Sequence, residues 1–424
     1  IPMKRAFLLL AATLITLTLN GCLGGAFNLG SSAPPPPDVR VIAADSSVTI
    51  TWTASPNVEY WVFAAPGNSV TPDNWNSIGG FAFPKATSPL VIHNLTNGKT
   101  YSFTLNARID GGPGGPGSPS ISATPRLAGA SWATASSPGN LNLNGVTAQD
   151  DASGKTRFVA VGDAGTLAVS NYFNANTAVT WTQPALTLNT PKPNFYTAVY
   201  GGVFLAAGSG GAILRSTDAT TWTAQTSGTT SDIYAIATNG AGGYVAVGQG
   251  GLIMTSLDGI TWTTQNSGTN RNLYAATYGD GAWIAVGQGG ILLTSANAIN
   301  WATVSSNTAR DLTGVSYGIT IDPATSTSVG AFIAVGASGT QLTSTDHGAT
   351  WRASLINNGI NDLKAIIYGR QFVAVGNGGS IYTSTDGASW TLQTSGTTSN
   401  LNAIGHGTAG LLTAGNSGVS LSAF

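Results

Sequence analysis

Charged residues are scarce in this sequence. Aspartate, glutamate, lysine and arginine make up 8% of the 424 residues, against about 25% in an average soluble domain. The net charge is -1, which excludes the basic surface that nucleic acid requires and an acidic tail. A single cysteine excludes an intramolecular disulfide. The three histidines lie far apart in the sequence, so we expect no metal site and no cofactor.

Glycine, serine, threonine and asparagine are abundant instead. They separate short runs rich in β-branched and aromatic residues, such as SVTITWTA and KTYSFTLNAR. Runs of this length and composition predict strands, and nothing in the composition suggests long helices. We therefore expect an all-β protein. At roughly 150 residues per domain, its length allows two or three domains.

Residues 1–22 have the features of an export signal. Lys4 and Arg5 precede an uncharged apolar run, Ala6 to Leu19, which is shorter than the roughly 20 residues of a spanning helix. The segment ends in Leu-Asn-Gly-Cys and resembles a bacterial lipoprotein signal. The resemblance implies that Cys22 is lipidated and becomes the mature N-terminus. The alternative is a plain secretory signal.

Leu23 follows this cysteine, and the lack of aspartate there implies sorting to the outer membrane. We expect an exported, lipid-anchored protein at the outer membrane or cell surface.

Residues 23–37 are rich in glycine, serine and proline, and end in four consecutive prolines. Such a segment favours an extended polyproline conformation. It predicts a tether that precedes the folded part.

Residues 38–126 contain six strand-length runs between turn signals. The segment resembles a fibronectin type III domain in its early Val-Arg-Val strand, in Trp52 on the second strand, and in the corner from Leu95 to Tyr101. The resemblance implies a β-sandwich in which these three residues are core and corner positions. We expect the glycine- and proline-rich loop at 111–117 to be a flexible tip.

Residues 127–424 repeat with a period of about 40 residues. Each repeat has three apolar runs, a Gly-x-x-Gly or Gly-x-Gly-Gly turn, and a tryptophan strand. Four strands in such a period predict a β-propeller blade. The tryptophan recurs seven times, at Trp132, Trp181, Trp222, Trp262, Trp301, Trp351 and Trp390. The predicted fold is a fibronectin type III-like β-sandwich followed by a seven-bladed β-propeller.

The order of the repeats predicts how the ring closes. The Trp132 strand precedes the first glycine turn, whereas the last repeat ends at Phe424 without its own tryptophan strand. We expect the Trp132 strand to complete the blade built by residues after Asn400. Such closure leaves no free sheet edge between the two ends.

The turn before each tryptophan has a recurring aspartate. STDHGATW at 344–351 resembles the Asp-box, the bacterial neuraminidase repeat, and four other turns resemble shorter versions of it. An aspartate there accepts backbone N–H bonds in a tight turn. We interpret four aspartates as structural in this sense: Asp218, Asp258, Asp346 and Asp386. The alternative is that these aspartates bind a metal ion.

A second group of polar residues precedes the strands that we expect to be innermost. An asparagine or aspartate stands there in every repeat, as a strand-capping turn residue or as part of a polar ligand-binding ring. Arg271 and Arg310 precede two of these positions, and we expect them side by side on the face of the channel. The candidate binding face comprises Arg271, Arg310, Asp232, Asp311, Asp362, Gln249 and Gln288.

The Asp-box resemblance raises the possibility of a sialidase. That chemistry needs a glutamate, but the one glutamate of the chain, Glu59, lies in the predicted sandwich. We identify no catalytic residues.

The repeats also resemble the non-catalytic propellers of the photosystem II assembly and stability factor type, which implies binding of protein partners. The favoured function is a non-catalytic scaffold that binds a protein or glycan; the alternative is a sialidase-like or other glycoside hydrolase. We expect a membrane attachment through the N-terminal lipid and no nucleic-acid partner. The oligomeric state stays open.

Overall fold

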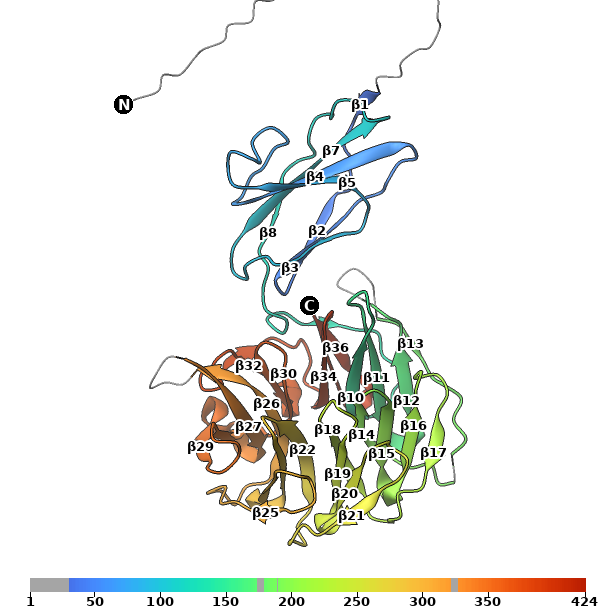
Figure 1. Cartoon of the computed structure of the whole chain (residues 1–424), viewed down its shortest axis with the longest axis vertical. Helices are drawn as coiled ribbons and strands as arrows, with labels where there is room; N and C mark the ends of the chain where they lie inside the picture. The colour runs from blue at the N-terminus through green and yellow to red at the C-terminus, as the bar shows by residue number, and fades with distance from the viewer. Residues whose placement is uncertain (1–29, 174–178, 189, 322–326) are drawn as a thin grey trace, which may run out of the picture.

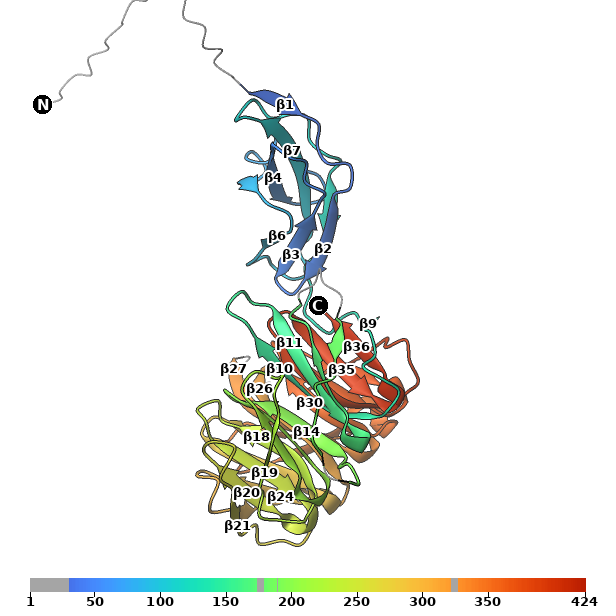
Figure 2. The same cartoon turned by 90° about the vertical axis from the view of Figure 1, so that its right-hand side faces the viewer.

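The computed structural model describes residues 30–173, 179–188, 190–321 and 327–424. These residues form strands and short 3-10 turns, arranged as two units that follow one another along the long axis (Figure 1 and Figure 2). The predicted signal and Cys22 lie outside the described residues. Within the described ranges, no helix has the length and apolar character needed to cross a membrane.

The first unit is a sandwich of two antiparallel sheets. One sheet has the order β1-β7-β4-β5 with β8 also paired to β7, and the other has the order β2-β3-β6. Val48 and Ile50 of one sheet pack against Phe103 and Leu105 of the other, and Trp52 fills the same core. The strands are β1 (Ser31–Ala33), β2 (Arg40–Ala44), β3 (Ser47–Thr51), β4 (Val58–Pro66), β5 (Phe81–Ala86), β6 (Leu90–Ile92), β7 (Tyr101–Ile109) and β8 (Ile121–Ala123). The fibronectin type III assignment stays a prediction.

Two segments of this unit differ from the expectation. Ser31–Ala33 lie in the predicted tether, yet they form β1 and pair with β7. The loop at 111–117 is held against the sheet, because the N–H of Gly115 donates to the carbonyl of Ala107 at 2.9 Å. A Cβ at Gly115 would collide with the carbonyl oxygen of Ala33. Gly115 therefore allows the loop to pack closely on β7, which the expectation of a flexible tip did not include.

The second unit contains seven four-stranded antiparallel sheets among the described residues. We number them blades 1 to 7 along the chain. The strands of blades 1 to 4 are β10 (Leu143–Asp150), β11 (Thr156–Gly162), β12 (Leu167–Ser170) and β13 (Trp181–Thr182); β14 (Phe195–Tyr200), β15 (Phe204–Gly208), β16 (Ile213–Ser216) and β17 (Thr223–Gln225); β18 (Ile233–Thr238), β19 (Tyr244–Gly248), β20 (Ile253–Ser256) and β21 (Thr263–Gln265); β22 (Leu273–Gly279), β23 (Ala282–Gly287), β24 (Leu292–Ser295) and β25 (Ala302–Thr303).

Blades 5 to 7 repeat this order. Their strands are β26 (Leu312–Ile321), β27 (Ser328–Gly336), β28 (Thr340–Ser344) and β29 (Arg352–Leu355); β30 (Leu363–Tyr368), β31 (Phe372–Gly376), β32 (Ile381–Ser384) and β33 (Thr391–Gln393); β34 (Leu401–Gly407), β35 (Gly410–Gly415), β36 (Ser420–Ala423) and β9 (Ala133–Thr134). The first strand of each blade contacts the first strand of the next blade, and β34 of blade 7 contacts β10 of blade 1. The first strands are therefore innermost, and the sheets form a closed propeller.

The ring closes as the repeat order predicts. β9 pairs antiparallel with β36, with Thr134 opposite Leu421 and Ala133 opposite Ser422. Trp132 packs against the blade core that contains Val373 and Leu421. The segment that leaves the sandwich thus supplies the outer strand of the last blade.

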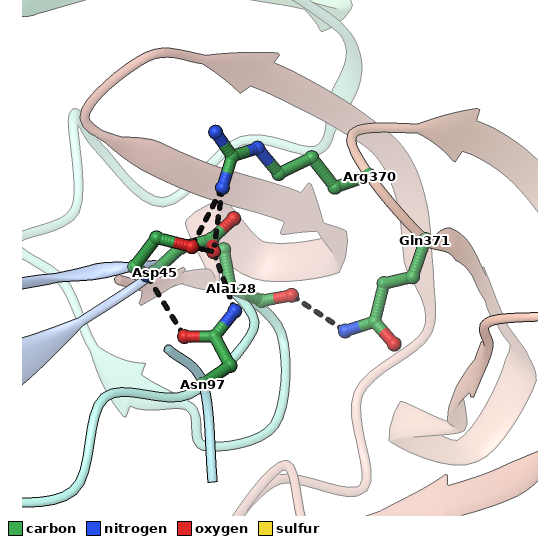
Figure 3. Close-up of polar contacts among 6 residues, drawn as sticks. Asp45, Asn97, Ala128, Arg370 and Gln371 are labelled. Atoms are coloured by element: carbon green, nitrogen blue, oxygen red, sulfur yellow. Dashed lines mark hydrogen bonds and ion pairs between the residues drawn. The ribbon is translucent and has the colours of Figure 1, made fainter. Parts of the chain in front are cut away.

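The sandwich contacts the turns that follow the innermost strands of the propeller. Nη1 of Arg370, in the turn between β30 and β31, lies 3.1 Å from Oδ1 of Asp45 and 2.8 Å from Oγ of Ser46 (Figure 3). Asn97 donates to the same Asp45 oxygen at 2.8 Å. Nε2 of the neighbouring Gln371 donates to the carbonyl of Ala128 at 2.7 Å. The opposite ends of the innermost strands are left without the sandwich.

Candidate functional site at the propeller mouth

The innermost strands begin at the end of the propeller that we call the mouth. The same end carries the glycine turns between the second and third strand of each blade: η1 (Asp163–Gly165), η2 (Ser209–Gly211), η3 (Gln249–Gly251), η4 (Gln288–Gly290), η5 (Ala337–Gly339), η7 (Asn377–Gly379) and η8 (Asn416–Gly418). The turn η6 (Ile356–Gly359) follows the outer strand of blade 5. The predicted binding-face residues lie at this end, on these turns and just before the innermost strands.

The asparagine or aspartate before each innermost strand joins two blades. In blade 5, the carbonyl of Asp311 accepts the N–H of Ala337 in its own glycine turn at 2.9 Å. Its Oδ1 accepts the N–H of Gly289, in the turn of blade 4, at 2.7 Å. The middle residue of each turn has a positive φ, 62° at Gly289, and its N–H is bound by the next blade. We call this side-chain bond the blade latch.

The blade latch occurs at all seven junctions of the described ring, with N to O distances from 2.7 to 3.0 Å. The latch residues are Asn142, Asn194, Asp232, Asn272, Asp311, Asp362 and Asn400. The bond from Asn142 to Ser417 closes the circle between blades 1 and 7. Asp232, Asp311 and Asp362 therefore each use a carboxylate oxygen to hold the ring together.

The predicted glutamines and arginines remain on the surface of the mouth. Gln249 and Gln288 are exposed, and Oε1 of Gln249 accepts the N–H of Asp232 at 3.3 Å. Arg271 donates to the carbonyl of Gly289 at 3.1 Å, and Arg310 donates to Oγ1 of Thr340 at 3.4 Å. Each arginine thus lies over the glycine turn of its own blade. Neither forms an ion pair with any of the described residues.

A β-bulge follows each latch residue and places one side chain at the inner edge of the ring. The pairing of the first two strands shifts by one residue there, as between Leu273 and Ala275. The bulged residues are Asn144, Tyr196, Tyr234, Tyr274, Thr313, Lys364 and Asn402. A bulge leaves one residue unpaired and redirects its side chain.

Three consecutive bulges carry tyrosine. The ring centroids of Tyr196 and Tyr234 are 5.7 Å apart, and those of Tyr234 and Tyr274 are also 5.7 Å apart. Burial raises the pKa of Tyr196 and Tyr234, and the nearby carboxylate of Asp232 raises both further. The hydroxyls therefore stay protonated near neutral pH and are available as hydrogen-bond donors. We call these three residues the tyrosine arc.

The other bulges differ in chemistry. Asn144, Thr313 and Asn402 each donate to a main-chain carbonyl at the start of the next innermost strand, at 2.5–3.2 Å. Lys364 is half-buried, and its side chain makes no hydrogen bond or ion pair with the described part of the chain. The mouth thus offers aromatic rings on blades 2 to 4, and cations on blades 4 to 6.

The Asp-box turns lie at the other end of the blades. Oδ1 of Asp258 accepts the N–H groups of Ile260 and Thr261, both at 2.8 Å, and these bonds lower the pKa of its carboxyl group. Asn297 accepts the equivalent bonds at 3.0 and 2.9 Å without a charge. The geometry is that of a hydrogen-bonded turn. Throughout the described ranges, no three His, Cys, Asp or Glu residues are grouped as a metal site would require.

Comparisons with known proteins agree with the propeller. The family model described as photosynthesis system II assembly factor YCF48 matches residues 172–377. Among 416 matching chains of solved structures is YCF48 bound to a D1 peptide. It has a TM-score of 0.54 and 17% identity, and the match covers 69% of this chain and 94% of that chain.

Two further solved structures have the same architecture. YCF48 from Cyanidioschyzon merolae has a TM-score of 0.52 and 18% identity, with 69% of this chain and 98% of that chain covered. The WD40 β-propeller domain of Doa1 has a TM-score of 0.54 and 11% identity, with 70% and 97% covered. No curated protein matches the chain. At these identities the similarity establishes the propeller fold.

The sequence analysis missed the tyrosine arc and Lys364. A signal for the tyrosine arc was present, because tyrosine stands two residues after the latch position in three consecutive repeats, whereas lysine stands there once. In an ordinary strand, side chains alternate between the two faces of the sheet. The bulge interrupts this alternation and places the tyrosine side chain at the mouth.

Proposed function

We propose that this chain is a non-catalytic scaffold that binds an extended, acidic segment of a partner protein at the propeller mouth. The tyrosine arc carries the proposal, since it places three neighbouring aromatic side chains at the same end of the propeller as Arg271 and Arg310. Tyrosine combines a large apolar surface with a polar hydroxyl, and it is enriched at protein interfaces. Arginine binds carboxylates through its forked donors.

The charge of the available groups favours an acidic partner. Asp232, Asp311 and Asp362 are occupied by blade latches, whereas the two arginines and Lys364 lack an acidic partner among the described residues. The latch carboxylates keep their charge, so the argument rests on these three unpaired cations, each of which can form an ion pair with an anionic segment. The same latches favour binding over glycoside hydrolysis, because the propeller sequence has no glutamate and these aspartates already bind backbone N–H groups.

The binding of a D1 peptide by a structurally similar propeller supports a protein partner. We further propose that the lipid on Cys22 anchors the protein to the outer membrane. The fibronectin type III-like sandwich then carries the propeller, and it contacts the end opposite the mouth. A mouth left open in this way is accessible to a partner.

The test uses a fluorescent ten-residue peptide of alternating glutamate and tyrosine, with a glutamine-tyrosine peptide as the neutral control. We expect fluorescence anisotropy to show binding of the acidic peptide that weakens with added salt. Arg271→Ala/Arg310→Ala should lower its affinity about 5- to 30-fold, since each exposed charge contact contributes about 0.5–1 kcal/mol.

The matched control is Arg40→Ala/Arg352→Ala, which removes two exposed arginines outside the mouth and changes the net charge equally. Equal weakening by both double variants would show a general charge effect and contradict a site at the mouth. Tyr234→Ala tests the aromatic contribution, and we expect it to weaken the acidic and the neutral peptide alike.

A further inference from the structure

An exposed apolar surface lies on the Asp-box turns of blades 3 and 4. Leu257 is 86% exposed, Ile299 is 54% exposed and Ile260 is 47% exposed. All three stand in tight turns whose hydrogen bonds come from the main chain and from Asp258 or Asn297. Turn formation therefore does not require these aliphatic side chains.

The other repeats act as internal controls. Leu257 corresponds to Thr217, Thr345 and Thr385 in blades 2, 5 and 6. Ile260 and Ile299 correspond to Thr220 in blade 2 and to alanine in blades 5 and 6. The same turn is thus built elsewhere with small or hydroxyl-bearing residues. Aliphatic side chains are concentrated on two adjacent blades, where they are exposed to solvent.

Leu257 and Ile299 line one groove of about 600 Å³ between these turns. Tyr244 and Trp283 also line it, and both are largely buried, at 3% and 4% exposed. The groove is bounded further by Thr263 and Gln265 of β21, the outermost strand of blade 3. One edge of β21 is unpaired within the sheet, so its main-chain groups can pair with another strand.

The groove matches an uncharged occupant. Among the described residues that line it, Asp258 is the one acidic residue, and its carboxylate is bound by the N–H groups of its own turn. Arg215 reaches this turn and donates to the carbonyl of Asp258 at 3.2 Å. The turns themselves contain no lysine or arginine, whereas binding to a lipid surface draws on clusters of them. A concave apolar groove next to a strand edge fits inserted side chains of a protein segment.

We propose that this groove binds an extended, uncharged segment of a second protein, which pairs with β21 and inserts aliphatic side chains between Leu257 and Ile299. Strand addition supplies main-chain hydrogen bonds, and pockets for alternate side chains supply specificity. The proposal is independent of the mouth, which lies at the opposite end of the blades. With both sites occupied, the propeller would hold two partners on two faces.

The test selects binders from a displayed library of random ten-residue peptides on the immobilised protein and measures their affinity by fluorescence anisotropy. We expect uncharged peptides with aliphatic residues at alternate positions. Leu257→Thr/Ile299→Thr, which installs the residue types of blade 2, should weaken them at least tenfold. Leu392→Thr is the control, because Leu392 is 59% exposed on β33 and lies outside the groove.

Four results would overturn the proposal. The selected peptides that do not depend on Arg271 and Arg310 could be charged, or they could bind Leu257→Thr/Ile299→Thr as well as the wild type at an unchanged melting temperature. Self-association that the double variant abolishes in light scattering would assign the groove to a second copy of the chain. Binding to phosphatidylcholine vesicles that the double variant abolishes would assign it to lipid. Arg271→Ala/Arg310→Ala should leave the uncharged selected peptides unaffected, whereas acidic peptides that it weakens belong to the mouth.

Discussion

Asp45 of the sandwich and Arg370 of the propeller are joined by an ion pair, with 3.1 Å between Oδ1 and Nη1. The aspartate side chain is 19% exposed and the arginine side chain is 62% exposed. Asn97 and Ser46 complete a small polar cluster around the pair (Figure 3). Gln371, the next residue, is buried and bonds to the segment that links the two units.

The junction predicts unequal effects of neighbouring substitutions. Arg370→Ala should lower the free energy of unfolding by about 0.2–1 kcal/mol, as for other exposed ion pairs. Gln371→Ala should cost about 1–3 kcal/mol, because it leaves the buried carbonyl of Ala128 without its donor. Denaturant unfolding checks both values. A larger loss for Arg370→Ala than for Gln371→Ala would contradict this ranking.

Removal of the closing strand should destabilise the ring. A chain that begins at Pro138 lacks β9, so the edge of β36 and the core around Leu421 become exposed. We expect a much lower melting temperature and aggregation, compared with a chain that begins at Leu127. Equal melting of the two chains, measured by scanning calorimetry, would show that β9 does not hold the ring closed.

The blade latch predicts that an amide can replace the carboxylate. Asp311→Asn keeps an oxygen for the N–H of Gly289, and asparagine already serves at four of the seven latch positions. We expect a change within about 0.5 kcal/mol, as for ordinary surface substitutions. Asp311→Ala leaves that N–H unpaired and should cost about 1–3 kcal/mol. Urea unfolding distinguishes them, and equal losses would argue against the latch.

The Asp-box turns predict sensitivity to acid. Hydrogen bonds from their own turns hold the pKa of Asp218 and Asp258 below the ordinary value. Their contribution to stability is complete above the unfolded pKa, which is about 3.9. It is lost as the pH falls from there through the folded pKa.

Asp218→Asn/Asp258→Asn should remove part of this loss, as Asn297 already forms the turn without a charge. Melting temperatures from pH 7 to pH 2 provide the measurement. A variant that loses stability below pH 4 as steeply as the wild type would contradict the assignment.

Lipidation of Cys22 remains a prediction from the signal alone. Cys22→Ser should move the protein from the detergent-extracted membrane fraction to the soluble fraction and abolish labelling with palmitate. A wild-type protein without label, together with a membrane-bound variant, would exclude the lipoprotein interpretation.

The repeat pattern predicted the blades and their closure, because the glycine turns and tryptophans mark every period. The blade latch was harder to predict. The polar residue before each innermost strand was recognised, but Asp232 binds Gly210 in the preceding blade. A pattern within one repeat describes the turn and not the neighbour that it contacts.

Two other features depend on details that the pattern does not contain. The tyrosine arc requires bulges, which redirect Tyr196, Tyr234 and Tyr274 without a sequence signature of their own. β1 forms from serine and alanine in a segment that composition assigns to a tether, because the edge of β7 is available to pair with it. In each case the partner strand decides the local structure.

The closing strand also determines how the protein responds to force. Ala133 and Thr134 follow directly on the linker from the sandwich, and they pair with Ser422 and Leu421. Tension between an N-terminal anchor and a partner held at the mouth would load the contacts of Arg370 and Gln371 with the sandwich and linker, and then the pairing of β9 with β36 in blade 7. The other six blades each keep four strands that are consecutive in the chain. Mechanical opening would begin at one seam, and the molecule would lengthen there before any complete blade unfolds.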